Sequence, residues 1–159
     1  MSVITFDVEV TSPIPLAKMF KAFILDADNL LPKVLPQAVK SIEVLEGDGG
    51  TGTIKLMTFG EGSRYKTAKH KVEALDKENF TYCYSIIEGE ILGSAYEKIS
   101  HELKITPSPE GGSVLKSTSS YFTIGEEDVT EEEINAGKEE ASAMVKAIEA
   151  YLVANPDAY

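Results

Sequence analysis

Cysteine is scarce in this chain, since Cys83 is the only one in 159 residues. A single thiol excludes a disulfide within the chain, and it excludes a cysteine-based zinc cluster. So little cysteine is typical of proteins in a reducing compartment. We therefore expect a cytoplasmic location.

Basic residues are also few compared with acidic residues. The chain has 15 Lys and Arg residues against 26 Asp and Glu residues, so its formal net charge is −11 with neutral histidines. Nucleic acids and anionic membranes are bound through clustered Lys and Arg side chains. The composition therefore argues against a nucleic-acid partner and against docking on a membrane surface.

Long hydrophobic runs are missing, because Lys, Asp or Pro interrupts each apolar stretch after a few residues. No segment has the length that a transmembrane helix needs. A secretory signal is not expected either, since Asp7 and Glu9 fall where its apolar core would lie and no basic region precedes them.

What remains is a globular composition, with 43% hydrophobic and 26% charged residues. We find no linker, internal repeat or low-complexity tract, which predicts a single domain over residues 1–159. A chain of this length buries roughly 70% of the surface that its unfolded form exposes, enough for an independent core. Nothing in the sequence demands a dimer, so we expect a monomer.

A hydrophobic period of two predicts strands separated by turn-forming residues. The expected strands cover residues 4–10, 40–45, 53–59, 65–74, 80–87, 96–106 and 113–121. Their short separators indicate a mostly antiparallel sheet. Helical spacing from Leu16 to Ile24 predicts a short helix after Pro15, and prolines at 32 and 36 limit a second helix after Asp26.

The last quarter of the chain changes to a helical period. Thr130 and Glu133 form a capping-box pattern, and apolar residues then recur from Ile134 to Leu152. Acidic residues at 126–128 and 131–133 are expected in a solvated turn and at the helix N-terminus, since calcium-loop spacing is absent. Strands first and a long helix last predict an α+β domain, with the helix on the concave side of the sheet.

The inward faces of these strands carry many polar groups. Alternation places His70 with Val72 and Ala74, and it places both histidines inward; the direction of the Lys55–Met57–Phe59 face stays open. An unpaired buried polar group costs about 1–3 kcal/mol. The facing helix offers mostly small side chains, namely Ala136, Gly137 and Ala141, with Met144. We therefore predict a ligand-filled or hydrated cavity; the alternative is a solid core whose polar groups satisfy one another.

A glycine-rich segment has the residue spacing of the dinucleotide-binding pattern G-x-G-x-x-G; it reads Gly47-Asp48-Gly49-Gly50-Thr51-Gly52. That pattern needs a following helix N-terminus to hold pyrophosphate, whereas the next residues alternate as a strand. Thr53 stands where a phosphate-binding loop of the Walker type needs lysine. We interpret the segment as a hairpin loop.

The two histidines are interpreted as pocket groups, because no cysteine or carboxylate lies at metal-ligand spacing from His70 or His101. Cys83 alternates opposite to Tyr82 and Tyr84, so it is expected on the outer face without a base to activate it. We expect no metal and no cofactor.

Several segments together resemble the plant pathogenesis-related class 10 proteins, the Bet v 1-like group of the major birch pollen allergen. The glycine-rich loop through Lys55 is similar, as are residues 20–23, 32–36, 84–89 and 151–159. The family signature from Gly89 to Tyr121 is almost complete, with Glu110 a mild departure in a turn. The resemblance covers essentially the whole chain.

This resemblance implies a helix-grip fold: a curved seven-stranded antiparallel sheet around a long C-terminal helix, two short helices and a large internal cavity. It implies an intracellular defence or stress protein, commonly allergenic, that reversibly binds amphipathic ligands such as flavonoids, cytokinins, brassinosteroids or fatty acids. The family's ligand positions fall on Lys55, Tyr82, Tyr84 and His101. Alternation adds Phe59, His70 and Tyr121.

The resemblance also implies rival functions. Weak ribonuclease activity would use Lys55, Glu97, Glu149 and Tyr151, although the negative net charge opposes the approach of RNA. A carbon–carbon condensing enzyme of this fold would need a carboxylate inside the cavity, and we predict none. A hormone receptor would need a specialised gate loop, which residues 59–63 do not resemble closely.

Overall fold

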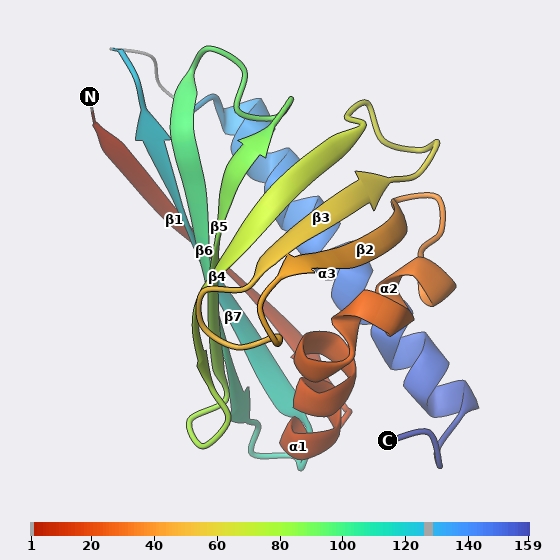
Figure 1. Ribbon diagram of the computed structural model, residues 1–159. Helices are drawn as coiled ribbons and strands as arrows, with labels where there is room; N and C mark the ends of the chain where they lie inside the picture. Colours follow the sequence, from red (N-terminus) through yellow and green to blue (C-terminus); the bar gives the residue numbers. More distant parts are fainter. Residues whose placement is uncertain (1, 126–128) are drawn as a thin grey trace.

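A seven-stranded antiparallel sheet forms the body of the structure (Figure 1). The computed structural model describes residues 2–125 and 129–159. The strands are β1 (Val3–Ser12), β2 (Val39–Glu46), β3 (Ile54–Phe59), β4 (Thr67–Asp76), β5 (Thr81–Gly89), β6 (Tyr96–Pro107) and β7 (Ser113–Thr123). Their spatial order is β1-β7-β6-β5-β4-β3-β2, so only the β1–β7 pair joins strands distant in sequence. The predicted antiparallel sheet is confirmed.

Three short helical segments, of which the first two are contiguous, and one long helix accompany the sheet. Between β1 and β2 the chain forms α1 (Leu16–Met19), a π-helical turn η1 (Phe20–Leu25) and α2 (Ala27–Val34). The long helix α3 (Glu131–Ala154) runs diagonally along the sheet, and its closest backbone approaches are to β1, η1 and α2 (Figure 1). The α+β class is therefore confirmed.

At the N-terminus of α3, one of the two hydrogen bonds of the predicted capping box is formed. The Thr130 hydroxyl accepts a hydrogen bond from the Glu133 amide at 3.1 Å. The Glu133 carboxylate accepts instead from the Tyr96 hydroxyl of β6 at 2.6 Å, so it ties the helix start to the sheet. The expected acidic turn at residues 126–128 lies outside the described residues, whereas residues 131–133 form the first turn of α3.

Strand β7 shows the predicted alternation throughout. The side chains from Ser113 to Thr123 alternate between buried and less buried, with Leu115, Ser117, Ser119 and Tyr121 on the inner face. On β3, burial of Met57 places its neighbours Lys55 and Phe59 inward as well, which settles the direction that alternation left open.

Strand β4 departs from simple alternation. Ala74, predicted on the inner face, is exposed, while Leu75 packs against the core. The pairing with β5 shifts between Val72 and Ala74, which inserts one residue into β4 and reverses its faces beyond that point. Phe80, predicted to begin the next strand, lies before β5 with a left-handed φ of 54°, and its ring packs edge-on against Phe20.

The buried side chains form two clusters. One gathers under α1, η1, α2 and the second half of α3, and includes Phe20, Leu30 and Ile148. The other lies toward the opposite end of the sheet and includes Ile86, Ile99 and Tyr121. Phe59 packs against both clusters.

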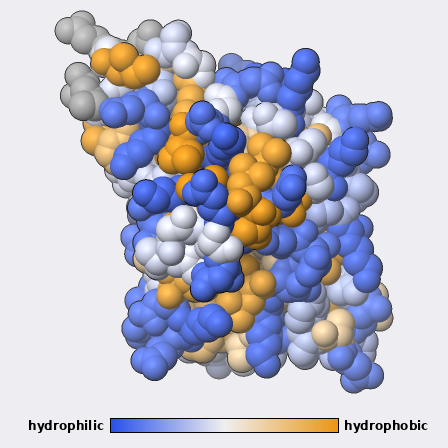
Figure 2. Space-filling model, in the orientation of Figure 1, coloured by the Kyte–Doolittle hydropathy of each residue, from blue (hydrophilic) through white to orange (hydrophobic). Residues whose placement is uncertain are grey.

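The outer surface is mostly hydrophilic on the face drawn in Figure 2, with apolar side chains gathered near its middle. Val44 and Leu45 of β2 keep 43% and 42% of their surface exposed. Among the described helices, none combines the length and the apolar character needed to cross a membrane.

Candidate ligand-binding site

A hollow of about 170 Å³ lies between the two core clusters. Its walls come from the inner faces of the sheet and from one stripe of α3. The stripe consists of Gly137, Glu140, Ala141 and Met144, which are spaced to share one helix face. We call this hollow the inner pocket. Ala136, predicted in the same small-residue stripe, lines the neighbouring hollows near the helix start.

Two further hollows adjoin the inner pocket. A pocket of about 80 Å³ lies toward α2 and contains Lys55 and Tyr82, and it shares His70, Tyr84 and Met144 with the inner pocket. A wider hollow of about 880 Å³, which we call the mouth, lies between the β3–β4 loop and the first half of α3. The Gly62–Tyr65 segment and Glu140 border the mouth.

All seven predicted ligand-contact residues line these pockets. Phe59, His101 and Tyr121 line the inner pocket, Lys55 and Tyr82 line the pocket toward α2, and His70 and Tyr84 line both. The sheet brings them together because neighbouring strands present their inward residues side by side. Their role in ligand binding stays a prediction.

Aromatic rings form a connected row along the inner pocket. The Tyr84 ring lies at the centre, with ring centroids 4.8 Å from His70, 5.1 Å from His101 and 5.5 Å from Tyr82. Tyr121 stacks on Phe6 at 5.5 Å. These flat faces can sandwich an aromatic or steroid-like body, since aromatic side chains combine a large apolar area with a polar tip.

The two histidines are neutral at neutral pH. Burial, with smaller contributions from the nearby His101 and Lys55, lowers the pKa of His70 from 6.5 to about 3. Burial alone lowers the pKa of His101 to about 4. The His101 Nδ1 and Ser119 Oγ atoms are hydrogen-bonded at 2.8 Å. The histidines therefore act as neutral hydrogen-bonding groups of the pocket wall.

The tyrosine hydroxyls keep their protons. Burial raises the pKa of Tyr82 to about 12, with a smaller contribution from Asp28. Burial also raises the pKa of Tyr84, and the neighbouring Tyr82 and Glu140 act in the same direction. Within residues 2–125 and 129–159, the hydroxyls of Tyr82 and Tyr84 make no hydrogen bond to protein. They remain available to a guest molecule or to water.

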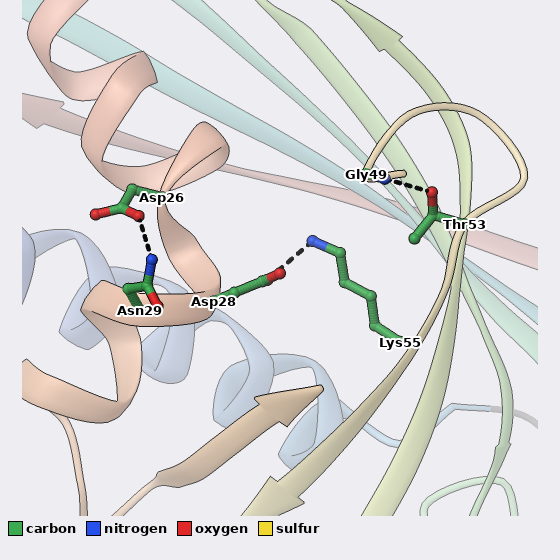
Figure 3. Close-up of polar contacts among 6 residues, drawn as sticks. All are labelled: Asp26, Asp28, Asn29, Gly49, Thr53 and Lys55. Carbon is green, nitrogen blue, oxygen red and sulfur yellow. Dashed lines mark hydrogen bonds and ion pairs between the residues drawn. The ribbon is translucent and has the colours of Figure 1, made fainter. Parts of the chain in front are cut away.

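Lys55 is already paired. Its Nζ atom lies 2.8 Å from Asp28 Oδ1, and its side chain keeps 14% of its surface exposed. Figure 3 shows the Lys55 side chain reaching from β3 to Asp28 at the start of α2. A ligand anion at Lys55 would therefore have to share or displace the Asp28 carboxylate.

The glycine-rich loop is a hairpin loop, as interpreted from the sequence. Gly47, Gly49 and Gly52 have left-handed φ values of 96°, 102° and 90°. The Gly49 amide donates to Thr53 Oγ1 at 2.9 Å (Figure 3), the Gly50 amide to Asp48 Oδ1 at 3.0 Å and the Gly52 amide to the Val72 carbonyl at 2.8 Å. These amides are engaged within the protein, so they cannot cradle a phosphate.

The four residues of the ribonuclease alternative occupy separate surroundings. Glu97 is exposed at the start of β6, Glu149 forms an ion pair with Lys146 at 3.2 Å, and the Tyr151 hydroxyl accepts from Lys33 Nζ at 3.0 Å. In the described part of the chain, no hydrogen bond or ion pair joins these residues to one another or to Lys55. The same part holds no group of three or more side chains suited to bind a metal.

Sequence reasoning missed Glu140. It expected no carboxylate inside the cavity, yet Glu140 lines both the inner pocket and the mouth. Burial raises the pKa of its carboxyl, although the residue counts as exposed, because the wall of an open hollow is accessible to water. Its position four residues before Met144 and three after Gly137 is the signal that could have revealed it.

The comparison with known families agrees with this architecture. A family model described as Pathogenesis-related protein Bet v 1 family matches residues 1–155. This chain belongs to that family. Among the curated relatives of this family member, the major allergen Pru av 1 of Prunus avium is 57% identical over 159 residues, covering 100% of the chain and 99% of the relative. The major strawberry allergen Fra a 1-2 of Fragaria ananassa is 56% identical with the same coverage.

Solved structures extend the similarity of this Bet v 1 family member. Ara h 8.0201 has a TM-score of 0.85 and 39% identity, covering 97% of this chain and 100% of that one. Norcoclaurine synthase from Thalictrum flavum, solved in complex with dopamine and hydroxybenzaldehyde, has a TM-score of 0.73 and 23% identity, covering 97% and 88%. At that identity the second similarity shows a shared fold alone.

Proposed function

We propose that this protein reversibly binds small amphipathic molecules, with the ligand's apolar body in the inner pocket. The observation that carries the proposal concerns Tyr84, which lines the inner pocket and whose hydroxyl has no protein partner among the described residues. A hydroxyl in such a hollow is stabilised when a guest or water supplies the missing hydrogen bond. Family membership supports the same function.

The ligand would extend beyond the inner pocket. Ligand pockets commonly measure about 300–1,000 Å³, whereas the inner pocket measures about 170 Å³ and the mouth about 880 Å³. We therefore place the apolar end among the rings around Tyr84 and the polar end toward the mouth. Burial of apolar surface would supply most of the affinity, at about 25 cal/mol per Å².

Flavonoids, cytokinins, brassinosteroids and fatty acids are the ligand classes that the family resemblance suggests for this pocket. The same resemblance suggests a cytoplasmic protein that takes part in defence and acts as an allergen. The sequence identity with two named allergens supports the last of these three properties. The binding proposal is tested by titrating the protein with a cavity-reporting dye and displacing the dye with these ligands. We expect saturable, competable binding, and its absence would contradict the proposal.

The tyrosine hydroxyls should discriminate among ligands. In Tyr82→Phe and Tyr84→Phe variants, the affinity for hydroxylated ligands should fall about 3- to 10-fold per removed hydroxyl, because each loses one hydrogen bond. The affinity for a saturated fatty chain should change less than about twofold, because the chain makes no hydrogen bond to these hydroxyls. Isothermal titration calorimetry of both ligand types measures the difference.

Tyr151→Phe provides the matched control for these variants, since Tyr151 bonds Lys33 and lines none of the three pockets described above. It should bind both ligand types as the unmodified protein does. Equal losses for hydroxylated and apolar ligands in the pocket variants would refute the orienting role of the hydroxyls.

A further inference from the structure

The walls of the inner pocket are almost free of net charge. His70 and His101 are neutral near neutral pH, and the Lys55 ammonium of the adjoining pocket is paired with Asp28. The remaining ionisable groups on the wall of the inner pocket are the hydroxyls of Tyr84 and Tyr121 and the carboxyl of Glu140. Glu140 is therefore the group whose charge a ligand in this pocket would meet.

Glu140 is placed to face a ligand. It lies on the pocket-lining stripe of α3, where the inner pocket opens into the mouth. Tyr84 and Tyr121 of the sheet line the same pocket, and the Glu140 charge adds to the raised pKa of both hydroxyls. Among the described residues, no Lys or Arg pairs with it and no donor bonds it.

The surroundings of Glu140 favour a cation. The mouth carries Glu132, Glu133 and Glu140, against one guanidinium from Arg64, which lies over the Tyr65 ring at 5.1 Å. The Tyr84 and Tyr121 rings offer negative faces beside the carboxylate, and such faces attract cations. The net charge of −11 draws cations toward the protein from a distance.

We infer that the pocket prefers ligands that carry an ammonium group on an apolar body, with the ammonium beside Glu140 and the body among the rings around Tyr84. The inference rests on the proposed binding function and specifies its substrate class. A partly desolvated ammonium–carboxylate pair is a strong, charge-assisted contact. An anionic ligand of the same shape would be repelled at this position, so a fatty acid would bind only with its carboxylate away from Glu140.

A matched probe series tests the preference. The probes are 4-phenylbutylamine, 4-phenylbutanol and 4-phenylbutyrate, which share one apolar body and differ in the charge of the end group. We expect the unmodified protein to bind the amine about tenfold more tightly than the alcohol, and the alcohol more tightly than the acid. Isothermal titration calorimetry near neutral pH gives the three affinities.

Glu140→Gln should abolish the preference for the amine while leaving the alcohol's affinity within about twofold. Glu139→Gln is the matched control, because it removes the same charge from the neighbouring residue, and Glu139 lines none of these pockets. It should retain the preference. Glu140→Met serves as a second variant, since it keeps side-chain length without polarity, and thermal unfolding of each variant checks that it is folded.

The outcomes separate the two proposals. If the alcohol binds in the pocket and the amine binds no better, or if Glu140→Gln keeps the preference, the inference about cations is overturned and the binding function stands. If neither the three probes nor a cavity-reporting dye binds, both proposals are overturned. An amine preference lost in Glu140→Gln and kept in Glu139→Gln supports the inference.

Discussion

Acidification from about pH 7.5 to about pH 5 is expected to lower the free energy of unfolding by about 4 kcal/mol through His70 and His101. Their pKa values in the folded protein are about 3 and about 4, against 6.5 in the unfolded chain. Below pH 6.5 the unfolded chain takes up protons that the folded protein excludes, so each histidine removes about 2 kcal/mol by pH 5. Above pH 6.5 neither contributes a pH dependence.

The double variant His70→Phe with His101→Asn isolates this effect. Phenylalanine keeps the ring that stacks on Tyr84, and asparagine keeps a polar group for Ser119. Carboxyl groups titrate in both proteins, including Glu140, whose raised pKa acts in the opposite direction. Denaturant unfolding at the two pH values should show about 4 kcal/mol less acid destabilisation in the variant. Identical pH dependence in both proteins would mean that the histidines are not held neutral.

Gly60→Ala is expected to destabilise the protein by about 3 kcal/mol. A Cβ atom at Gly60 would lie 2.5 Å from the carbonyl oxygen of Gln37 and closer still to that of Pro36. These are backbone atoms of the segment after α2, and they are held in place by hydrogen bonds from the Gly60 amide to Ala38 at 3.0 Å and from the Gly62 amide to Gln37 at 2.8 Å. Relief of the clash would therefore have to break the contact that closes this side of the mouth.

Gly125→Ala is the control for that substitution, because its Cβ would meet nothing within 4 Å and its φ is not left-handed. Its free energy of unfolding should change by less than about 0.5 kcal/mol. Chemical denaturation of both variants gives the comparison. Similar stabilities for the two would show that the chain after α2 is free to move away from the β3–β4 loop.

Much of the fold follows from hydrophobic periodicity. Strand β7 alternates between two faces over its whole length, because the register shift in its pairing with β6 inserts its extra residue into β6, between Tyr96 and Lys98. In β4 the same reasoning misplaced Ala74, because a bulge depends on how the partner strand pairs rather than on the residues of β4 alone. Phe80 was misplaced for a similar reason, since a left-handed φ at a bulky residue is imposed by the surrounding turn.

The candidate site was predictable where one strand face decides it. Tyr82, Tyr84 and His101 sit on faces that alternation identifies, and all three line the hollow space. The partner of Lys55 could not be foreseen, because Asp28 lies 27 residues earlier and meets it only through the packing of α2 on the sheet. Glu140 was missed because a charged helical residue is ordinarily solvated, and only the hollow makes an inward carboxylate tolerable.

Gly137 offers the most direct test of the claim that hollow space inside the domain binds ligands. An ideal Cβ at this position has its nearest neighbour, the Phe6 Cζ atom, at 4.0 Å, and the residue lines the inner pocket. Glycine within a helix is less favourable than alanine or leucine by about 0.5–1 kcal/mol. Gly137→Ala should therefore gain about that much stability with binding unchanged, whereas the larger side chain of Gly137→Leu would occupy the pocket.

We predict that Gly137→Leu is at least as stable as the unmodified protein in denaturant unfolding and binds the cavity dye at least about 30-fold more weakly, because its side chain takes the place of the ligand. A loss of several kcal/mol in stability would show that the interior is already filled. Full stability with undiminished dye binding would place the ligand elsewhere and contradict the account.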